Sequence, residues 1–165
     1  MKNTKEQVRS LLKSFSFAFS GIKSAVISER NFRIHITICI GLVLFSLLYR
    51  PNRLEAMVLV FSCCFVMVCE LFNTAIETLM DMNSNGYNRY VKLIKDISAG
   101  AVLISAIGAL VCGLLLFWKE KTLAVFETII QSPLYICIGV LYVVFGTCFV
   151  FLIRPTMKKK PDILN

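Results

Sequence analysis

Four long runs of apolar residues alternate with short polar segments along the chain. They cover Ile34–Tyr49, Ala56–Met80, Ile97–Trp118 and Leu134–Ile153. Runs of this kind are typical of α-helices that cross a bilayer, which need about 20 apolar residues each. The first run is short for a full crossing. The pattern predicts an all-α, polytopic membrane protein.

The residues before the first run follow a different pattern. Apolar side chains recur at helical spacing between Val8 and Val26, and Lys, Arg and Ser occupy the face between them. This predicts an amphipathic helix on the membrane surface, with its basic face towards water and anionic head groups. We therefore divide the chain into a surface helix (1–33), a transmembrane core (34–118) and a further segment (119–165) with a fourth transmembrane helix and a basic tail.

Turn-forming residues separate the apolar runs. Arg50–Arg53 contains Pro and Asn, which predict a short hairpin between the first two spans. The strongest turn signal is Asp81–Gly86. It leads into a polar connection over Tyr87–Lys95, so the third span is expected to begin at Ile97. Apolar residues are scattered among polar ones in Lys119–Ser132, which is expected to lie along the outer interface.

Composition and charge agree with a membrane location and suggest an orientation. The chain has 165 residues, is 57% hydrophobic, and carries 18 basic and 10 acidic side chains, for a net charge of +8. Basic residues near span ends concentrate on the cytoplasmic side. With both termini in the cytoplasm, fourteen of the eighteen basic residues lie on that side.

The cysteines and the histidine give no sign of a metal site. The seven cysteines lie inside apolar runs without CxxC spacing, so we expect them to pack as small apolar residues. His35, the only histidine, opens the first span and is expected to lie at the interface.

The second apolar run carries an unusual acidic face. Glu70, Asn73, Glu77 and Asp81 fall on one side of a helix with about 100° of rotation per residue. A carboxylate at membrane depth costs roughly 2.5 to 3.5 kcal/mol, so it usually faces a partner, a cavity or a substrate. This face is therefore a candidate functional site.

The polar residues near this face suggest phosphoryl transfer without any known nucleotide motif. No Walker A sequence, Gly-rich dinucleotide turn or protein-kinase signature occurs. Magnesium prefers one or two carboxylates plus phosphate oxygens, a lysine offsets phosphate charge, and a carboxylate can accept a proton from an attacking hydroxyl. The candidates are Glu29, Glu70, Asn73, Glu77, Asp81, Lys95 and Asp96. The same residues are compatible with a cation channel or transporter, or with a polar interface that only joins helices.

Three sequence blocks resemble the prokaryotic diacylglycerol kinase and undecaprenol kinase family. They occur in the family's order and at its distances: Glu29–His35 after Gly21–Lys23, Glu70–Glu77, and Lys95–Leu103. The resemblance covers roughly residues 10–118. It implies three membrane helices per subunit, a surface amphipathic helix, a homotrimer with composite active sites, and MgATP as phosphoryl donor to a membrane lipid alcohol.

The resemblance also implies roles for individual residues. Glu70 would accept the proton of the lipid hydroxyl, and Asn73 would help to position the site. Glu29 and Glu77 would hold magnesium and, with Tyr87, Lys95 and Asp96, form the nucleotide-binding set. Asp81 is expected to order the turn, and Ser98 and Gly100 to be packing residues.

Some positions depart from the family pattern. Phe17 stands where a tyrosine is common, and Gly86 and Asn88 flank Tyr87 in place of the usual neighbours. The block that begins at Glu29 is closer to the undecaprenol kinase branch, so undecaprenol is slightly preferred over diacylglycerol. The expected partners are ATP, the lipid alcohol and membrane lipids, with no nucleic acid. The expected location is the cytoplasmic membrane of a bacterium, with the active site facing the cytoplasm.

Overall fold

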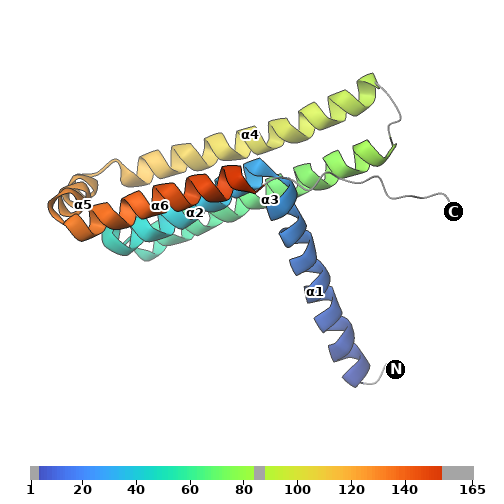
Figure 1. Ribbon diagram of the computed structural model, residues 1–165, viewed down its shortest axis with the longest axis horizontal. Helices are drawn as coiled ribbons and strands as arrows, with labels where there is room; N and C mark the ends of the chain where they lie inside the picture. The colour runs from blue at the N-terminus through green and yellow to red at the C-terminus, as the bar shows by residue number, and fades with distance from the viewer. Residues whose placement is uncertain (1–3, 84–87, 154–165) are drawn as a thin grey trace.

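The computed structural model describes residues 4–83 and 88–153, which form six α-helices and no strand. The helices are α1 (Thr4–Ser28), α2 (Arg30–Tyr49), α3 (Arg53–Asn83), α4 (Arg89–Phe117), α5 (Glu120–Gln131) and α6 (Pro133–Leu152) (Figure 1). Four of them, α2, α3, α4 and α6, are long and apolar enough to cross a membrane. The predicted all-α polytopic membrane protein is thus confirmed, and α2 gains the length that its apolar run lacked by starting at Arg30.

Helices α3 and α4 form the longest pair of the bundle. They pack against each other, α2 packs on α3, and α6 packs on α2. At the end where α1 joins α2, which we call the junction end, α3 and α4 extend well past α2 and α6 (Figure 1). At the opposite end, which we call the hairpin end, the turn between α2 and α3 lies near α5 (Figure 1).

The hairpin between the first two spans is confirmed, and local hydrogen bonds explain it. Arg50 ends α2 in the left-handed region, with φ 50° and ψ 68°. Asn52 and Glu55 then form a reciprocal capping box: each side chain accepts from the main-chain N–H of the other, at 2.9 Å in both cases. The polar residues of this turn thus end one helix and start the next.

Helix α4 begins before the third apolar run. It starts at Arg89, so most of the polar connection expected over 87–95 is helical. The Asn88 side chain caps the helix by accepting from the N–H groups of Tyr90 and Val91. The start of the third span at Ile97 stays a prediction, because a helix can continue with polar residues outside the lipid.

Helix α1 projects away from the bundle (Figure 1). Ala25, in its last turn but one, is its only buried residue in the described part of the chain. Glu29 then has an extended backbone, with φ −107° and ψ 115°, so the chain changes direction there before α2 begins. The location of α1 on a membrane surface stays a prediction.

Aromatic and charged contacts hold the hairpin end together. Tyr49 is buried, donates from its hydroxyl to the Leu116 carbonyl oxygen at 3.2 Å, and packs edge-on against Phe117. The Lys119 ammonium pairs with Glu55, and the Lys121 ammonium lies 4.5 Å from the centre of the Tyr49 ring. These contacts tie the start of α5 to α2 and α3.

Candidate active site

The acidic face of α3 runs from the interior of the bundle to its surface. Glu70 is only 2% exposed, and Asn73 is also buried. One turn further on Glu77 is half-buried, and the side chain of Asp81 is about half exposed. The residues that share this face of α3 therefore become more exposed from Glu70 to Asp81.

Asn73 joins the two central helices through hydrogen bonds. Its Nδ2 donates to Oε1 of Glu77 at 3.0 Å, and its Oδ1 accepts from the Ser98 hydroxyl on α4 at 2.7 Å. Ser98 is buried, and it also lies 2.9 Å from the Lys95 carbonyl oxygen. Ser98, which was expected to be a packing residue, is buried, and its hydroxyl also donates to Asn73. Polar residues on two neighbouring helices at the same depth were the signal for this pair.

Glu29 approaches the same face from a different element. It lies at the break between α1 and α2 and is half-buried. The carboxylates of Glu29 and Glu77 both act electrostatically on Glu70. Carboxylates from the α1–α2 junction and from α3 thus lie within electrostatic range of Glu70.

Lys95 and Asp96 are neighbours in sequence but have different partners. Lys95 forms an ion pair with Asp81 across the α3–α4 pair. Asp96 forms an ion pair with Lys92 on its own helix, at 3.2 Å, and both side chains are more than 60% exposed. Asp81 lies in the last turn of α3 and holds Lys95, and its expected role in ordering the turn stays a prediction.

The positions that depart from the family pattern fall in three different places. Tyr87 and Gly86 lie outside the described residues. Asn88 caps α4, a role that needs a short polar side chain. Phe17 is exposed on α1.

Two of the carboxylates fit a magnesium ion that is shared with phosphates. Within the described residues, no three His, Cys, Asp or Glu side chains are placed to hold a metal on their own. Magnesium bound with a nucleotide takes only one or two protein carboxylates and fills its other positions with phosphate oxygens and water. Glu29 and Glu77 come from different elements, are both half-buried and lie within electrostatic range of Glu70, so they are carboxylates of the kind that this binding mode would use.

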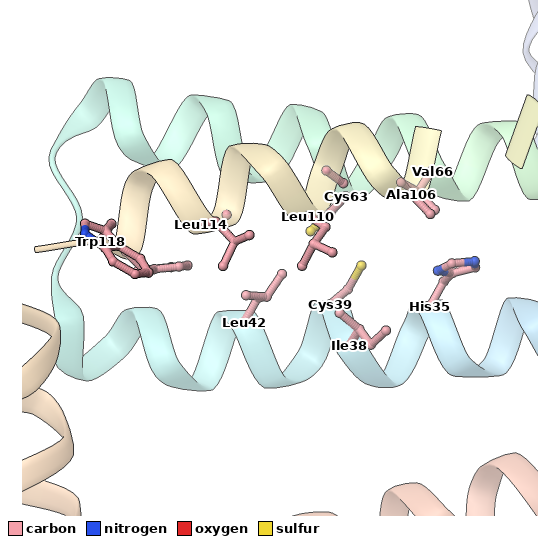
Figure 2. Close-up of a pocket in the computed structure, with 13 residues that line it drawn as sticks. His35, Ile38, Cys39, Leu42, Cys63, Val66, Ala106, Leu110, Leu114 and Trp118 are labelled. Carbon is pink, nitrogen blue, oxygen red and sulfur yellow. The ribbon is translucent and has the colours of Figure 1, made fainter. Parts of the chain in front are cut away.

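An apolar cavity of about 510 Å³ lies between α2, α3 and α4 (Figure 2). His35 and Val66 line one end of it, and Trp118 lines the other. Val66 is one helical turn before Glu70 on the same face of α3, so this end of the cavity lies next to the acidic residues. His35 contributes to the wall of this cavity, and its expected location at the membrane interface stays a prediction.

Arg33 is the residue that the sequence analysis missed. It is 2% exposed and donates hydrogen bonds to the ends of two helices. The sequence places it among the basic residues that set the orientation and within the Glu29–His35 block, with no individual role. An arginine inside a membrane helix generally has partners in the protein, and its place one turn into α2 was the available signal.

Known proteins with related sequences are lipid kinases. Residues 16–117 match the model of the prokaryotic diacylglycerol kinase family. A diacylglycerol kinase of Synechocystis is 36% identical over 68% of this chain, and the match spans 65% of that protein. An undecaprenol kinase of Bacillus subtilis is 30% identical over 70% of the chain, and a diacylglycerol kinase of Escherichia coli 26% over 73%, with 94% and 98% of their own lengths matched. No solved structure matches the chain significantly.

The family match covers the part of the chain that builds the acidic site. It includes the α1–α2 junction, α2, α3 and α4, and it stops before α5 and α6. The three sequence blocks that carry the resemblance lie within it. The chain therefore belongs to the prokaryotic diacylglycerol kinase family of membrane lipid kinases.

Proposed function

We propose that the chain transfers the γ-phosphoryl group of MgATP to the hydroxyl of a membrane lipid alcohol, with undecaprenol slightly preferred over diacylglycerol. The observation that carries this proposal is the buried carboxylate of Glu70, placed between an apolar cavity and the two half-buried carboxylates of Glu29 and Glu77. The block that begins at Glu29 supports undecaprenol as the substrate.

In this reaction Glu70 acts as the general base. The lipid hydroxyl oxygen attacks the γ-phosphorus, the bond from that phosphorus to the ADP oxygen breaks, and the hydroxyl proton passes to Glu70. Asn73 keeps α3 and α4 in register beside this carboxylate through Glu77 and Ser98. Hydrogen bonds from Asn73 to Glu77 and from Ser98 to Asn73 therefore order the helix faces next to the base before the substrate arrives.

The nucleotide binds on the junction side of Glu70. Glu29 and Glu77 hold magnesium, which when bound neutralises phosphate charge. Lys95 lies on the neighbouring helix, with Asp81 orienting its ammonium group. Asp96 and Tyr87 complete the proposed nucleotide-binding set.

The lipid tail occupies the apolar cavity between α2, α3 and α4. Its volume and its aliphatic and aromatic walls suit a hydrocarbon chain. Val66 at one end of the cavity lies one helical turn from Glu70, which supports binding of the lipid hydroxyl at that end. The proposal thus orients the substrate with its tail towards the hairpin end and its head group at the junction end.

The working enzyme is a homotrimer in the cytoplasmic membrane of a bacterium, with its junction end in the cytoplasm. The distribution of basic residues supports this orientation. The long stretch of α3 and α4 beyond α2 supports assembly, since in one subunit few elements flank the proposed nucleotide site (Figure 1).

Purified protein in detergent micelles tests the proposal. MgATP is supplied with undecaprenol or with diacylglycerol, and phosphate transfer to each lipid is measured. Glu70→Gln should abolish transfer, because the amide cannot accept the proton. Glu55→Gln is the matched control, since Glu55 is a largely buried carboxylate at the other end of the same helix. No transfer by the wild type to any lipid alcohol, together with ion flux in liposomes, would overturn the kinase in favour of a channel.

A further inference from the structure

Arg33 uses every N–H group of its guanidinium on helix ends. Nη1 donates to the carbonyl oxygens of Val26 at 2.9 Å and Ile27 at 3.1 Å, in the last turn of α1. Nε and Nη2 donate to Val150, each at 3.2 Å, and Nη2 also donates to Ile153 at 3.2 Å, at the end of α6. Arginine has five such donors, so all of them are satisfied.

This arrangement explains how a buried cation is tolerated. The last carbonyl groups of a helix lack partners within the helix and carry the negative end of its dipole. The guanidinium of Arg33 meets two such ends at once. Arg33 therefore fastens the end of α6 to the end of α1.

Helix α6 packs along α2 through contacts that recur at each helical turn. Gly146 of α6 faces Thr37 of α2, and a Cβ atom on Gly146 would lie 2.8 Å from Thr37 Cγ2. Tyr142 donates from its hydroxyl to the Thr37 carbonyl oxygen and covers Gly41. The contacting pairs are spaced one turn apart on both helices: Gly41 with Tyr142, Thr37 with Gly146, and Arg33 with Val150.

The same arginine lies one turn after Glu29. Glu29 has an extended backbone between two helices, so its direction depends on how α1 leaves α2. The hydrogen bonds from Arg33 to Val26 and Ile27 fix that direction. Helix α6 lies beyond the matched residues 16–117, so part of this support comes from an added helix.

We infer that α6 serves the active site, and that Arg33 is the positioning residue through which its carbonyl end holds Glu29 in place. The inference rests on the proposed role of Glu29 in magnesium binding. When α6 is displaced, two of the carbonyl groups that orient Arg33 are lost, the junction loosens, and Glu29 no longer has a fixed position beside the acidic face of α3. The consequence is weaker binding of magnesium without loss of the lipid site.

Two glycines of α6 provide a matched pair of variants. Gly146→Leu forces α6 away from Thr37, whereas Gly139→Leu adds the same side chain where nothing lies within 4 Å of the new Cβ. In the full-length protein we measure the magnesium concentration for half-maximal activity, the KM for lipid, and the rate of trypsin cleavage at Lys23 and Arg30 without substrate. Relative to Gly139→Leu, Gly146→Leu should need about tenfold more magnesium, the typical effect of losing a supporting residue of a metal site. It should also be cleaved faster at the junction, with the KM for lipid unchanged.

Two results would overturn the inference. One is equal behaviour of the two leucine variants. The other is faster cleavage of Gly146→Leu with an unchanged magnesium requirement, which would separate the junction from the metal. A wild type that phosphorylates no lipid would refute the proposed function instead, and cleavage at the junction would still report whether α6 holds it.

A milder pair keeps the test decisive if Gly146→Leu does not fold. Gly146→Ala introduces only the Cβ that meets Thr37 Cγ2. Thr37→Ser removes that methyl group and keeps the hydroxyl that donates to the Arg33 carbonyl oxygen. Added to Gly146→Ala, Thr37→Ser should therefore bring the magnesium requirement back to the wild-type value. A double variant whose magnesium requirement stays as high as that of Gly146→Ala would contradict a steric effect transmitted through α6.

Discussion

At the scale of single residues, the site depends on polar side chains that are buried and paired. Asn73 is buried and bridges Glu77 and Ser98, so each of its hydrogen bonds joins a different part of the site. Burying an unpaired polar group costs about 1–3 kcal/mol. Removing one partner should therefore affect the site more than the loss of one hydrogen bond suggests.

Ser98→Ala tests this chain of hydrogen bonds. The substitution leaves Oδ1 of Asn73 without its donor, and we expect kcat to fall about tenfold, which corresponds to about 1.4 kcal/mol. Ser105→Ala is the control, since Ser105 is equally buried on α4 but donates to the Val102 carbonyl oxygen of its own helix. Equal kcat values for the two variants would show that Ser98 only fills space.

Asp81→Asn tests the ion pair that orients Lys95. Without the carboxylate the lysine ammonium loses its fixed position, so the KM for ATP should rise several-fold while the KM for lipid stays constant. Lys92→Met breaks the other ion pair of this region, whose side chains are mostly exposed and whose contribution is about 0–1 kcal/mol. A larger effect of Lys92→Met than of Asp81→Asn on the KM for ATP would contradict the role of Asp81.

The sequence predicted which residues form the acidic face, but it did not predict the contacts of Ser98 and Arg33. The acidic face of α3 follows from helical spacing alone, because all of its members lie on one helix. The contacts of Ser98 and Arg33 depend on which helices are neighbours and at what height. Periodicity along one helix does not contain that information.

At the scale of helices, hydrogen bonds from side chains hold the ends of several elements in place. The α2–α3 turn has a capping box, and Asn88 caps the start of α4. Arg33 donates hydrogen bonds to the last carbonyl groups of α1 and α6. Apolar runs predicted the four membrane-crossing helices, since lipid allows few polar residues. They did not predict the start of α4 at Arg89, because hydropathy does not distinguish a polar segment of a helix from a polar loop.

The ion pair at the hairpin end predicts a dependence of stability on pH. Hydrogen bonding to Glu55 raises the pKa of Lys119. A raised pKa means that the pair contributes fully below the ordinary lysine pKa of about 10.4 and is lost as the pH rises through the folded-state value. The melting temperature of the wild type should exceed that of Lys119→Met at about pH 8, and the difference should disappear above the raised pKa. A difference that persists there would show that Lys119 acts through packing instead of charge.

At the scale of the whole molecule, four helices are long and apolar enough to cross a membrane: α2, α3, α4 and α6. If each of them crosses once, both ends of the described chain lie on the same side. The junction end of the bundle therefore carries α1, the end of α6 and the acidic site together.

Labelling of introduced cysteines tests this topology. In a cysteine-free background, a cysteine at Asn165 should react only when the cytoplasmic side is open to a membrane-impermeant reagent. A cysteine at Glu120, at the start of α5, should react from the outside. Labelling of both positions from one side would mean that α6 does not cross the membrane.

The unequal lengths of the helices determine where the two substrates meet. Helices α2 and α6 have 20 residues each, about 30 Å, which is the thickness of the hydrocarbon core. Helices α3 and α4 have 31 and 29 residues, and their excess length projects beyond the junction (Figure 1). We therefore expect Glu70 to lie near the boundary of the hydrocarbon core, with Glu77 and Lys95 on the water side. Under the proposed function, a lipid that never leaves the bilayer can react with a nucleotide that never enters it.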